Sequence, residues 1–271
     1  MKKKLLAALL ICALAVSALT GCGGTAGTDT SSSDKKTFTV GFDAEYPPYG
    51  YMDDNGEYTG FDLELAAEVC KLNGWELIKQ PISWDNKDNE LNTGAIDCIW
   101  NGFTMNGRED AYTWSDPYVD NSQVVVVAKD SGVSVPADLK DKTVGVQAAS
   151  AALDLLKSNE EGGQKALADT FKGLQEFSDY NTAFVELEAG SIDAIAMDIG
   201  VAQYQLESRG NGKYIILDEH LNAEKYAIGF KKGNDSLRDT VNKSLHDLKA
   251  NGTFDTLAEK YKLSDMTCLE K

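Results

Sequence analysis

The chain has 271 residues, and its 43 acidic side chains outnumber the 26 basic ones to give a formal net charge of −17. This length allows two modest lobes or one large domain, and a content of 42% hydrophobic and 25% charged residues is typical of a globular protein. The excess of acid argues against nucleic acid as a partner, because binding nucleic acid needs patches of Lys and Arg.

The amino terminus has the pattern of a secretory signal peptide. Residues 2–4 are lysines, and residues 5–19 form an apolar run that is short for a permanent membrane helix. The run ends in Leu19-Thr20-Gly21-Cys22, which resembles the lipobox of bacterial lipoproteins. That resemblance implies that residues 1–21 are removed and that the Cys22 thiol is acylated. The alternative is an ordinary signal peptide followed by a chance cysteine.

A segment rich in Gly, Ser and Thr follows, and we interpret residues 22–36 as the lipidated cysteine and a flexible tether. A lipid, a tether and a folded body together predict a protein held at the outer face of the bacterial cell membrane. If the host has an outer membrane, the same features predict a periplasmic location.

The cysteines leave the redox state open. If Cys22 carries lipid, the thiols of Cys70, Cys98 and Cys268 remain. One disulfide with one free thiol, or three free thiols, would both suit a secreted protein. The chain has no Cys-x-x-Cys pair and no Cys/His cluster, so we expect no structural zinc and no other cofactor.

Short β-branched runs alternate with helical patterns along the rest of the chain. The strands predicted from these runs are residues 37–42, 76–81, 95–101, 123–129, 143–147, 194–198, 214–218 and 225–231. Apolar spacing predicts helices that begin at Phe61, extend over 237–248 until Gly252, and extend over 254–261. Alternating strands and helices predict an α/β fold with largely parallel sheets.

Two pairs of similar segments indicate two related lobes. "LNTGAIDCI" (91–99) resembles "LEAGSIDAI" (187–195), and "TVGF" (39–42) resembles "TVGV" (143–146). Open α/β sheets bind ligands beyond the carboxyl ends of their strands. If the two lobes face each other, the strand ends at 43–48, 101–108, 147–150 and Asp198 converge on one cleft.

The strand ends of the first half offer an arginine, a hydroxyl, an acid and two aromatic rings. Arg108 has a planar fork suited to a carboxylate, or it pairs locally with a neighbouring acid. Thr104 adds a hydroxyl. Tyr46 and Trp84 either stack on a ligand or pack within the protein, and Asp43 either accepts a cation or amide or caps a turn.

The second half offers Ser150 and Asp198. Ser150 either receives an anion near a helix start or simply caps the helix. Asp198 closes an apolar strand, where a carboxylate needs a cation unless it caps the helix at 199–209. An arginine for a carboxylate, an aspartate for an ammonium and aromatic rings for a side chain together describe an α-amino acid.

Six stretches from about Thr37 to about Leu263 resemble the polar amino acid solute-binding proteins of bacterial ABC importers, often called family 3. They are GFDAEYPPYGY, GEYTGFDLELAAEV, AIDCIWNGFTMNGREDAYTWSDPY, DLKDKTVGVQAAS, GSIDAIAMD and LKANGTFDTLAEKY. The resemblance implies a two-lobed type II periplasmic-binding-protein fold, in which each lobe is a mostly parallel sheet flanked by helices. A two-strand hinge would cross near 120–123 and 217–225. We therefore define lobe 1 as residues 37–121 plus 223–271 and lobe 2 as residues 122–222.

The resemblance also implies roles for site residues. Arg108 would clamp the ligand α-carboxylate with help from Thr104 and Ser150. Asp198 and the carbonyl of Gly102 would receive the α-ammonium. The side chain would lie between the aromatic rings of residues 46 and 84, with the acid at residue 43 near its far end.

The chain departs from the family pattern at three places. The Thr104–Arg108 segment is one residue shorter than the Thr-x-Thr-Pro-Glu-Arg that members commonly have, and Ala151 stands where a second hydroxyl is common. Asn101 replaces a usually small residue and is expected at the side-chain pocket. These changes bear on which ligand is bound.

We therefore expect a substrate-binding component of an ABC importer, a monomer without enzymatic activity that closes on a polar L-amino acid and passes it to the permease. Alternatives are a dehydratase of aromatic amino acid biosynthesis on the same fold, an amino-acid sensor module, or a structural surface protein. The two histidines, His220 and His246, are expected to be ordinary surface residues. Asp43 and the overall acidity slightly favour a cationic side chain in the ligand.

Overall fold

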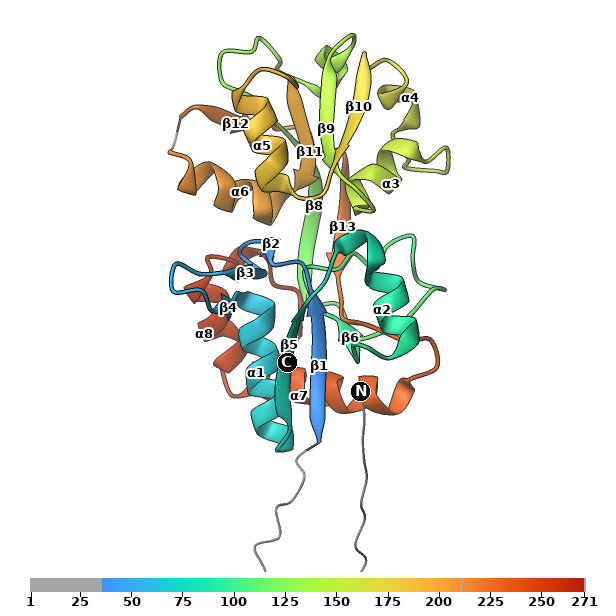
Figure 1. Ribbon diagram of the computed structural model, residues 1–271, viewed down its shortest axis with the longest axis vertical. Coiled ribbons are helices and arrows are strands. Elements are labelled where there is room, and N and C mark those ends of the chain that lie inside the picture. Colours follow the sequence, from blue (N-terminus) through green and yellow to red (C-terminus); the bar gives the residue numbers. More distant parts are fainter. Residues whose placement is uncertain (1–35, 211, 271) are drawn as a thin grey trace, which may run out of the picture. The chain divides into compact units, whose positions relative to one another are not determined.

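The computed structural model describes residues 36–210 and 212–270 (Figure 1). The expected signal peptide, the lipidation site at Cys22 and nearly all of the expected tether lie outside the described residues. Within the described part, no helix combines the length and apolar character needed to cross a membrane.

The first sheet forms the core of the region predicted as lobe 1. Its strand order is β5-β1-β6-β14-β7. These strands are β1 (Thr37–Phe42), β5 (Glu76–Pro81), β6 (Cys98–Ile99), β7 (Thr113–Trp114) and β14 (Gly229–Phe230). A small sheet beside it contains β2 (Glu45–Tyr46), β3 (Gly50–Met52) and β4 (Tyr58–Thr59). The helices of this region are α1 (Phe61–Asn73), α2 (Lys87–Thr93), α7 (Asp235–Ala250) and α8 (Thr253–Lys260), with short 3₁₀ turns η1 (Trp84–Asn86) and η3 (Ser264–Met266).

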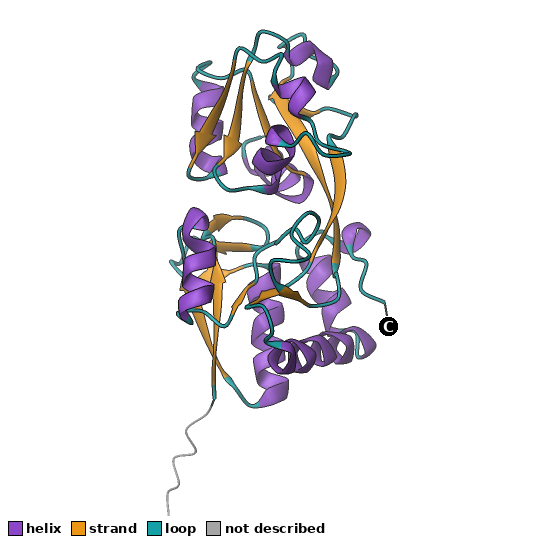
Figure 2. Ribbon diagram, turned by 90° about the vertical axis from the view of Figure 1, so that its right-hand side faces the viewer, coloured by secondary structure: helices purple, strands orange, loops and turns teal. Residues whose placement is uncertain are grey.

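The second sheet forms the core of the other region. Its strand order is β10-β9-β11-β8-β12, and β13 also pairs with β8. These strands are β8 (Val119–Ala128), β9 (Thr143–Gln147), β10 (Gly173–Phe177), β11 (Ala194–Asp198), β12 (Tyr214–Ile216) and β13 (Asn222–Tyr226). Helices flank this sheet (Figure 2). They are α3 (Ala151–Lys157), α4 (Lys165–Ala168), α5 (Tyr180–Glu188) and α6 (Ile199–Ser208), together with the 3₁₀ turn η2 (Pro136–Leu139).

The two sheets are joined by the antiparallel pair of β8 and β13, whose register runs from Val119 with Tyr226 to Gln123 with Asn222 (Figures 1 and 2). Both sheets are mixed, so the prediction that each would be mostly parallel is correct for only part of each sheet. The pairs β1–β5, β1–β6, β9–β10 and β9–β11 are parallel, as predicted. The strands paired with β8 and β14 are antiparallel, because a chain that leaves one sheet for the other returns in the opposite direction. The exact limits of the lobes stay a prediction.

Four predicted strands, 37–42, 76–81, 143–147 and 194–198, have the bounds that the structure shows. The prediction of one strand over 225–231 is wrong, because the chain changes partner there: β13 pairs with β8, whereas β14 pairs with β6 and β7. The predicted strand at 95–101 is too long. Only β6 forms a ladder, since the backbone turns at Gly102 with φ of 57°. A continuous apolar pattern does not reveal either event.

The core is largely one cluster of buried side chains, and it includes residues from both regions, such as Tyr46, Tyr180 and Tyr226. Cys70 and Cys98 are buried in the structure and Cys268 is partly exposed. All three thiols are free, so of the two possibilities left open by the sequence the structure has three free thiols.

The backbone conformation at the start of α1 can be tested by substituting Gly60, the residue just before the helix. It precedes the helix with φ of 131°, and a Cβ at this position would overlap the carbonyl of Tyr49. We expect Gly60→Ala to lower the free energy of unfolding by about 3 kcal/mol, because strain in this Gly-only region of φ/ψ adds to the overlap. Urea denaturation measures the loss.

The matched control is Gly56→Ala. Gly56 also has a positive φ, 83°, but an added Cβ would have no neighbour within 4 Å. The control should lose only about 1 kcal/mol from the left-handed backbone. Equal losses in the two variants would contradict the predicted contact with Tyr49.

Candidate functional site

Asp198 lies where β11 ends and α6 begins, and only 3% of it is exposed. Its carboxylate does not cap α6. It accepts hydrogen bonds from two amide side chains of β8, Asn121 at 2.8 Å and Gln123 at 2.7 Å. Tyr226 of β13 donates a third bond at 2.6 Å. Asp198 is therefore bound to both strands that connect the two sheets, and the interpretation as a simple helix cap does not describe it.

A second carboxylate, Glu224 of β13, shares the same donors. Its Oε1 atom accepts from Asn121 Nδ2 at 2.7 Å and from Gln123 Nε2 at 2.8 Å. Thr104 donates its hydroxyl to the same oxygen at 2.7 Å. Glu224 is 5% exposed, and burial, together with the charge of Asp198, raises its pKa to about 7. The sequence analysis missed Glu224. The available signal was its position two residues before Tyr226, because residues two apart in a strand lie on the same face, and both are buried here.

The two amides that bridge these carboxylates have free acceptor atoms. Asn121 Oδ1 and Gln123 Oε1 are buried and accept no hydrogen bond in the structure. Two carboxylates and two orphaned amide oxygens therefore lie together at the connecting strands: Asn121 and Gln123 are on β8, Glu224 is on β13, and Asp198 is at the end of the neighbouring β11. A buried group of acceptors such as this one is suited to a cation that has several N–H donors.

Four tyrosines surround this acidic group. Tyr46 Oη lies 3.3 Å from Tyr226 Oη, and Tyr180 Oη lies 3.4 Å from Asp198 Oδ2. The Tyr49 and Tyr226 rings meet edge to face with centroids 5.2 Å apart. Tyr46 is thus packed within the protein, which is one of the two alternatives that the sequence left open, and its stacking on a ligand stays a prediction. The sequence analysis did not identify the other three rings.

Arg108 makes its ion pair across the two regions. Its Nη2 atom lies 2.7 Å from Asp154 Oδ2 of α3, its Nη1 donates to the Thr104 carbonyl at 3.4 Å, and its guanidinium lies 5.3 Å from the Phe103 ring centroid. The sequence alternative of a pair with an adjacent acid is not what the structure shows. The Arg108 side chain is 15% exposed and that of Asp154 is 65% exposed. An ion pair with so exposed an acid contributes little stability.

A continuous series of contacts links Arg108 to Asp198. Arg108 bonds the backbone of Thr104, and the Thr104 hydroxyl bonds Glu224. Glu224 shares its two amide donors with Asp198. The guanidinium and the acidic group thus belong to one connected polar network.

Ser150 and Asp43 have definite partners. Ser150 caps α3, since its hydroxyl accepts from Leu153 N at 3.1 Å, which is the helix-cap alternative. Asp43 accepts from the Glu45 backbone at 2.9 Å and from Gln147 Nε2 of the second sheet at 2.6 Å. It therefore caps a turn and receives an amide at once. Burial raises the pKa of Asp43 to about 6.

Gly102 and Asn101 form the bend after β6. The Gly102 N–H donates to Asp62 Oδ2 at 2.6 Å, and Asp62 also accepts from the Tyr118 hydroxyl at 2.9 Å. This fully buried acid holds the bend in place, and burial raises its pKa to about 7. Asn101 is buried, and both its side-chain nitrogen and oxygen are without a hydrogen bond.

Trp84 is half-buried in η1, and its ring meets Phe103 edge to face at 5.5 Å. The ammonium of Lys87 lies 5.0 Å from the centroid of the Trp84 ring. No pattern in the sequence marked Lys87, because it stands in a polar run with no apolar periodicity.

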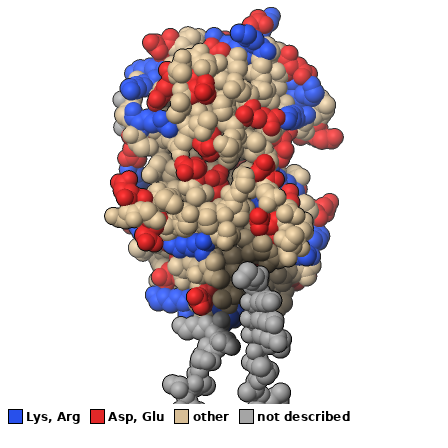
Figure 3. Space-filling view, in the orientation of Figure 1, with Lys and Arg blue, Asp and Glu red and all other residues tan. Residues whose placement is uncertain are grey.

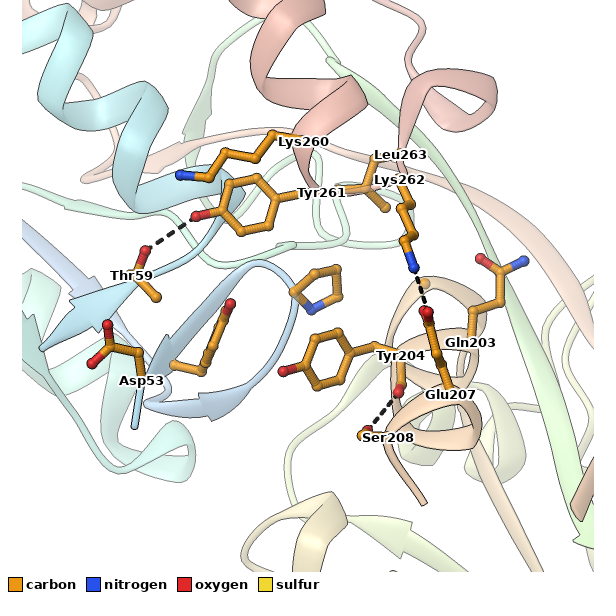
Figure 4. Close-up of a pocket in the computed structure, with 13 residues that line it drawn as sticks. Asp53, Thr59, Gln203, Tyr204, Glu207, Ser208, Lys260, Tyr261, Lys262 and Leu263 are labelled. Atoms are coloured by element: carbon orange, nitrogen blue, oxygen red, sulfur yellow. Dashed lines mark hydrogen bonds and ion pairs between the residues drawn. The ribbon is translucent and has the colours of Figure 1, made fainter. Parts of the chain in front are cut away.

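One cavity of about 360 Å³ is lined by Asn121 and Glu224 of this network, and another of about 460 Å³ lies away from it, between α1 and α7. A larger one, of about 650 Å³, lies between α6 and the β3–β4–α8 part of the chain (Figure 4). In that cavity Lys262 pairs with Glu207, and Tyr261 contacts Thr59. The four cavities that we describe over residues 36–210 and 212–270 are lined by neither Arg108 nor Asp198. In the same residues, no cluster of three or more His, Cys, Asp or Glu side chains could hold a metal ion.

Two α/β units joined by two strands, with polar groups from both units meeting between them, define a solute-binding protein of the type II periplasmic-binding fold. The chain belongs to the bacterial extracellular solute-binding proteins, family 3, whose model matches residues 38–264. The predicted family and fold class are therefore confirmed.

Curated relatives cover nearly the whole chain. The L-cystine-binding protein TcyA of Bacillus subtilis is 30% identical over 277 residues, which is 96% of this chain and 97% of the relative. The arginine-binding extracellular protein ArtP of Bacillus subtilis is 30% identical over 263 residues, 96% of this chain and 98% of the relative.

Solved structures that are similar to this one are also described as binding proteins. A substrate-binding protein of an ABC uptake transporter from Streptococcus pneumoniae, with bound histidine, has a TM-score of 0.80 and 31% identity over 86% of this chain and 95% of that one. An ancestral amino acid-binding protein described as a precursor of cyclohexadienyl dehydratase has a TM-score of 0.74 and 30% identity over 83% of this chain and 95% of that one.

The hydrogen bond from Tyr226 to Asp198 is open to a direct test. We expect Tyr226→Phe to lower the free energy of unfolding by about 2 kcal/mol, because a bond to a charged acceptor is worth roughly 1.5–3 kcal/mol. Denaturant titration measures this loss. Tyr180→Phe removes only the 3.4 Å contact with the same carboxylate and should cost less than about 1 kcal/mol. A loss from Tyr180→Phe as large as that from Tyr226→Phe would contradict the assignment.

Proposed function

We propose that this protein captures a polar L-amino acid between its two lobes and delivers it to the permease of an ABC importer. Family membership, relatives named for binding cystine and arginine, and a structural neighbour with bound histidine support this function. The observation that carries the proposal is the connected network in which Arg108 lies at one end and Asp198 with Glu224 at the other.

The α-ammonium is received by the two carboxylates of Asp198 and Glu224, which lie at the connecting strands β8 and β13. Asp198, Glu224 and the two orphaned amide oxygens of Asn121 and Gln123 supply more acceptors than an ammonium has protons. The carbonyl of Gly102 is the acceptor from the bend after β6. Two negative groups in a buried place favour a cation over any neutral donor.

The α-carboxylate is received by Arg108. The ligand carboxylate replaces Asp154, which is largely exposed and so holds the guanidinium weakly. Replacement is favourable because a buried bidentate pair is stronger than a solvated one. The Thr104 hydroxyl can turn from Glu224 to the same carboxylate, and Ser150 at the start of α3 approaches it from the other lobe.

Closure is the step that stabilises binding. The ligand binds lobe 1 first, through Arg108 and the aromatic rings, and lobe 2 then brings Ser150 and Asp198 onto it. Ligand favours the closed form only through contacts made in that form. Cross-lobe bonds such as Asp43 with Gln147 show how side chains reach between the lobes in the structure.

We propose that the mature protein is a monomer anchored by lipid at Cys22 on the outer face of the cell membrane, or in the periplasm of a host with an outer membrane. The one face drawn in Figure 3 does not favour nucleic acid as a partner. Acidic and basic side chains are interspersed on the face shown, without a patch of one sign (Figure 3).

The dehydratase alternative is less favoured. The curated relatives described above are named as binding proteins, and the structural neighbour described as a precursor of cyclohexadienyl dehydratase is itself an ancestral amino acid-binding protein. His246 of α7 bonds Asp116 at 2.8 Å and the Glu270 carbonyl at 3.2 Å, and His220 lies exposed in a loop. Neither histidine is hydrogen-bonded to a residue of the acidic group or to Arg108.

Thermal unfolding in the presence of the twenty amino acids and cystine tests the function. A ligand at about 100 times its dissociation constant should add about 2.7 kcal/mol of stability, which is several degrees. Arg108→Ala should weaken binding of that ligand a hundredfold or more, because removing one partner of a buried charge pair costs roughly 3–5 kcal/mol. Arg238→Ala, on α7, is the control and should bind normally. Absence of any shift with the native protein, or unchanged calorimetric affinity in Arg108→Ala, would contradict the proposal.

Glu224 makes binding depend on pH. Its pKa is raised to about 7 in the structure, and a ligand ammonium beside it lowers that pKa, so binding releases a proton. Affinity should therefore rise by up to about tenfold per pH unit toward pH 7 and level off above it. Calorimetry from pH 5.5 to 8, in two buffers of different ionisation enthalpy, measures the released proton.

In Glu224→Gln this released proton and the rise in affinity should disappear. The control is Glu219→Gln, whose side chain is exposed in the loop before β13 and should keep the native pH profile. A Glu224→Gln profile identical to the native one would remove Glu224 from the ammonium site.

A further inference from the structure

Lys87 is a buried cation that the binding scheme above does not use. It begins α2, and only 5% of it is exposed. The first turn of a helix is unfavourable for a positive charge, because the free N–H groups there already carry partial positive charge. Burying a lysine at this position costs free energy unless its charge is paired and hydrogen-bonded.

The Lys87 ammonium lies between the two lobes. It donates to the carbonyl of Trp84 at 3.3 Å and to the carbonyl of Ala149, from the loop after β9, at 3.2 Å. The Trp84 ring centroid is 5.0 Å away. Within residues 36–210 and 212–270 no carboxylate lies within ion-pair distance of Lys87, in contrast to Arg108, which pairs with Asp154. Its partners are therefore neutral carbonyls at long hydrogen-bond distances.

Lys87 has both acids and a cation near it. Burial and the charge of Arg108 lower the pKa of Lys87 to about 8, whereas the charges of Asp88, Asp154 and Asp85 tend to raise this pKa. Lys87 therefore remains mostly protonated at pH 7. The carboxylates of Glu224, on β13, and of Asp198, at the end of β11, lie at the other end of the network. The network thus has two carboxylates at one end and, near α2, the two cations Lys87 and Arg108, of which Arg108 alone is paired with Asp154.

Asp43, expected from the sequence to receive a cationic side chain, already has partners. It accepts from the Glu45 backbone and from Gln147. Gln147 ends β9 and Ala149 lies two residues further on, in the loop after it, so Asp43 and Lys87 contact the same short segment of the chain. Of these two opposite charges, the cation of Lys87 has the weaker partners.

We propose that Lys87 is a specificity residue that receives a carboxylate on the side chain of the bound amino acid. This inference rests on the proposed function. The ligand is an amino acid with a second carboxylate, either an acidic amino acid such as L-glutamate or a double amino acid such as L-cystine. A cationic side chain would meet the like charge of the Lys87 ammonium, which lies near the Trp84 ring. This reverses the preference for a cationic ligand that was inferred from the acidity of the sequence.

The test compares ligands of equal shape and different charge. Isothermal calorimetry measures L-glutamate against L-glutamine, with L-cystine and L-arginine as further probes. In the native protein, glutamate or cystine should bind at least tenfold more tightly than glutamine and arginine, because a charge-assisted bond is worth about that factor or more. Whichever of glutamate and cystine binds more tightly identifies the source of the second carboxylate.

Lys87→Met keeps the length of the side chain and removes its charge. It should lose the preference for the carboxylate ligand, and Lys87→Arg should retain most of it. A merely structural role for Lys87 would lower all affinities together and leave the ratio unchanged. Lys36→Met is the matched control, since Lys36 also lies over a tryptophan, Trp75 at 4.4 Å, but is exposed at the start of β1.

The outcomes separate the two proposals. Arginine or glutamine bound as tightly as glutamate and cystine by the native protein would overturn the role of Lys87 and leave amino-acid capture standing. A carboxylate preference that survives in folded Lys87→Met would likewise overturn it. If none of the twenty amino acids or cystine binds, the proposed function fails, and this inference fails with it.

Discussion

Two carboxylates that share two amide donors are the constraint on which the rest of the site depends. Asp198 and Glu224 are both buried, and each accepts hydrogen bonds from Asn121 and Gln123. Like charges at such close range repel, so the fold must supply donors from both sides to hold them together. Tyr226 and Thr104 complete the set. An ammonium would relieve the repulsion more completely than these neutral donors can, which is why we assign the amino group of the ligand to this place.

The topology explains how such a pair can form. Asp198 comes from the end of a central strand of the second sheet, while Glu224 lies on β13, which pairs with β8. Because β8 is antiparallel to both β11 and β13, Gln123 stands opposite Asp198 on one side and Asn222 on the other. The mixed character of the sheet is therefore what places an amide of one strand between the acids of its two neighbours.

Many of the strands were predictable from the sequence. Residues 143–147 and 194–198, for example, are short apolar runs, and the predicted bounds are those of β9 and β11. The candidate site residues Arg108 and Asp198 were identifiable because one is a lone arginine in the loop after an apolar strand and the other is an acid at the end of one. Their partners were not. Asp154 and Glu224 are ordinary acids in an acidic chain, and only the fold brings them to Arg108 and Asp198. Lys87 was not predicted for a similar reason. A lysine in a polar run gives no sign that it will be buried. In addition, its hydrogen bond to the Ala149 carbonyl joins positions 62 residues apart.

The placement of Glu224 on a connecting strand has an effect on how selection can act. A mutation that adapts this carboxylate to a different ligand also alters a strand that joins the two sheets, so under the proposed closure, ligand preference and ease of closure would change together. The helix α2 is not one of the two connecting strands. A substitution on α2 can therefore change ligand preference without changing those strands. Diversification of ligand among relatives should therefore concentrate on the side facing α2, while the ammonium end is held nearly constant.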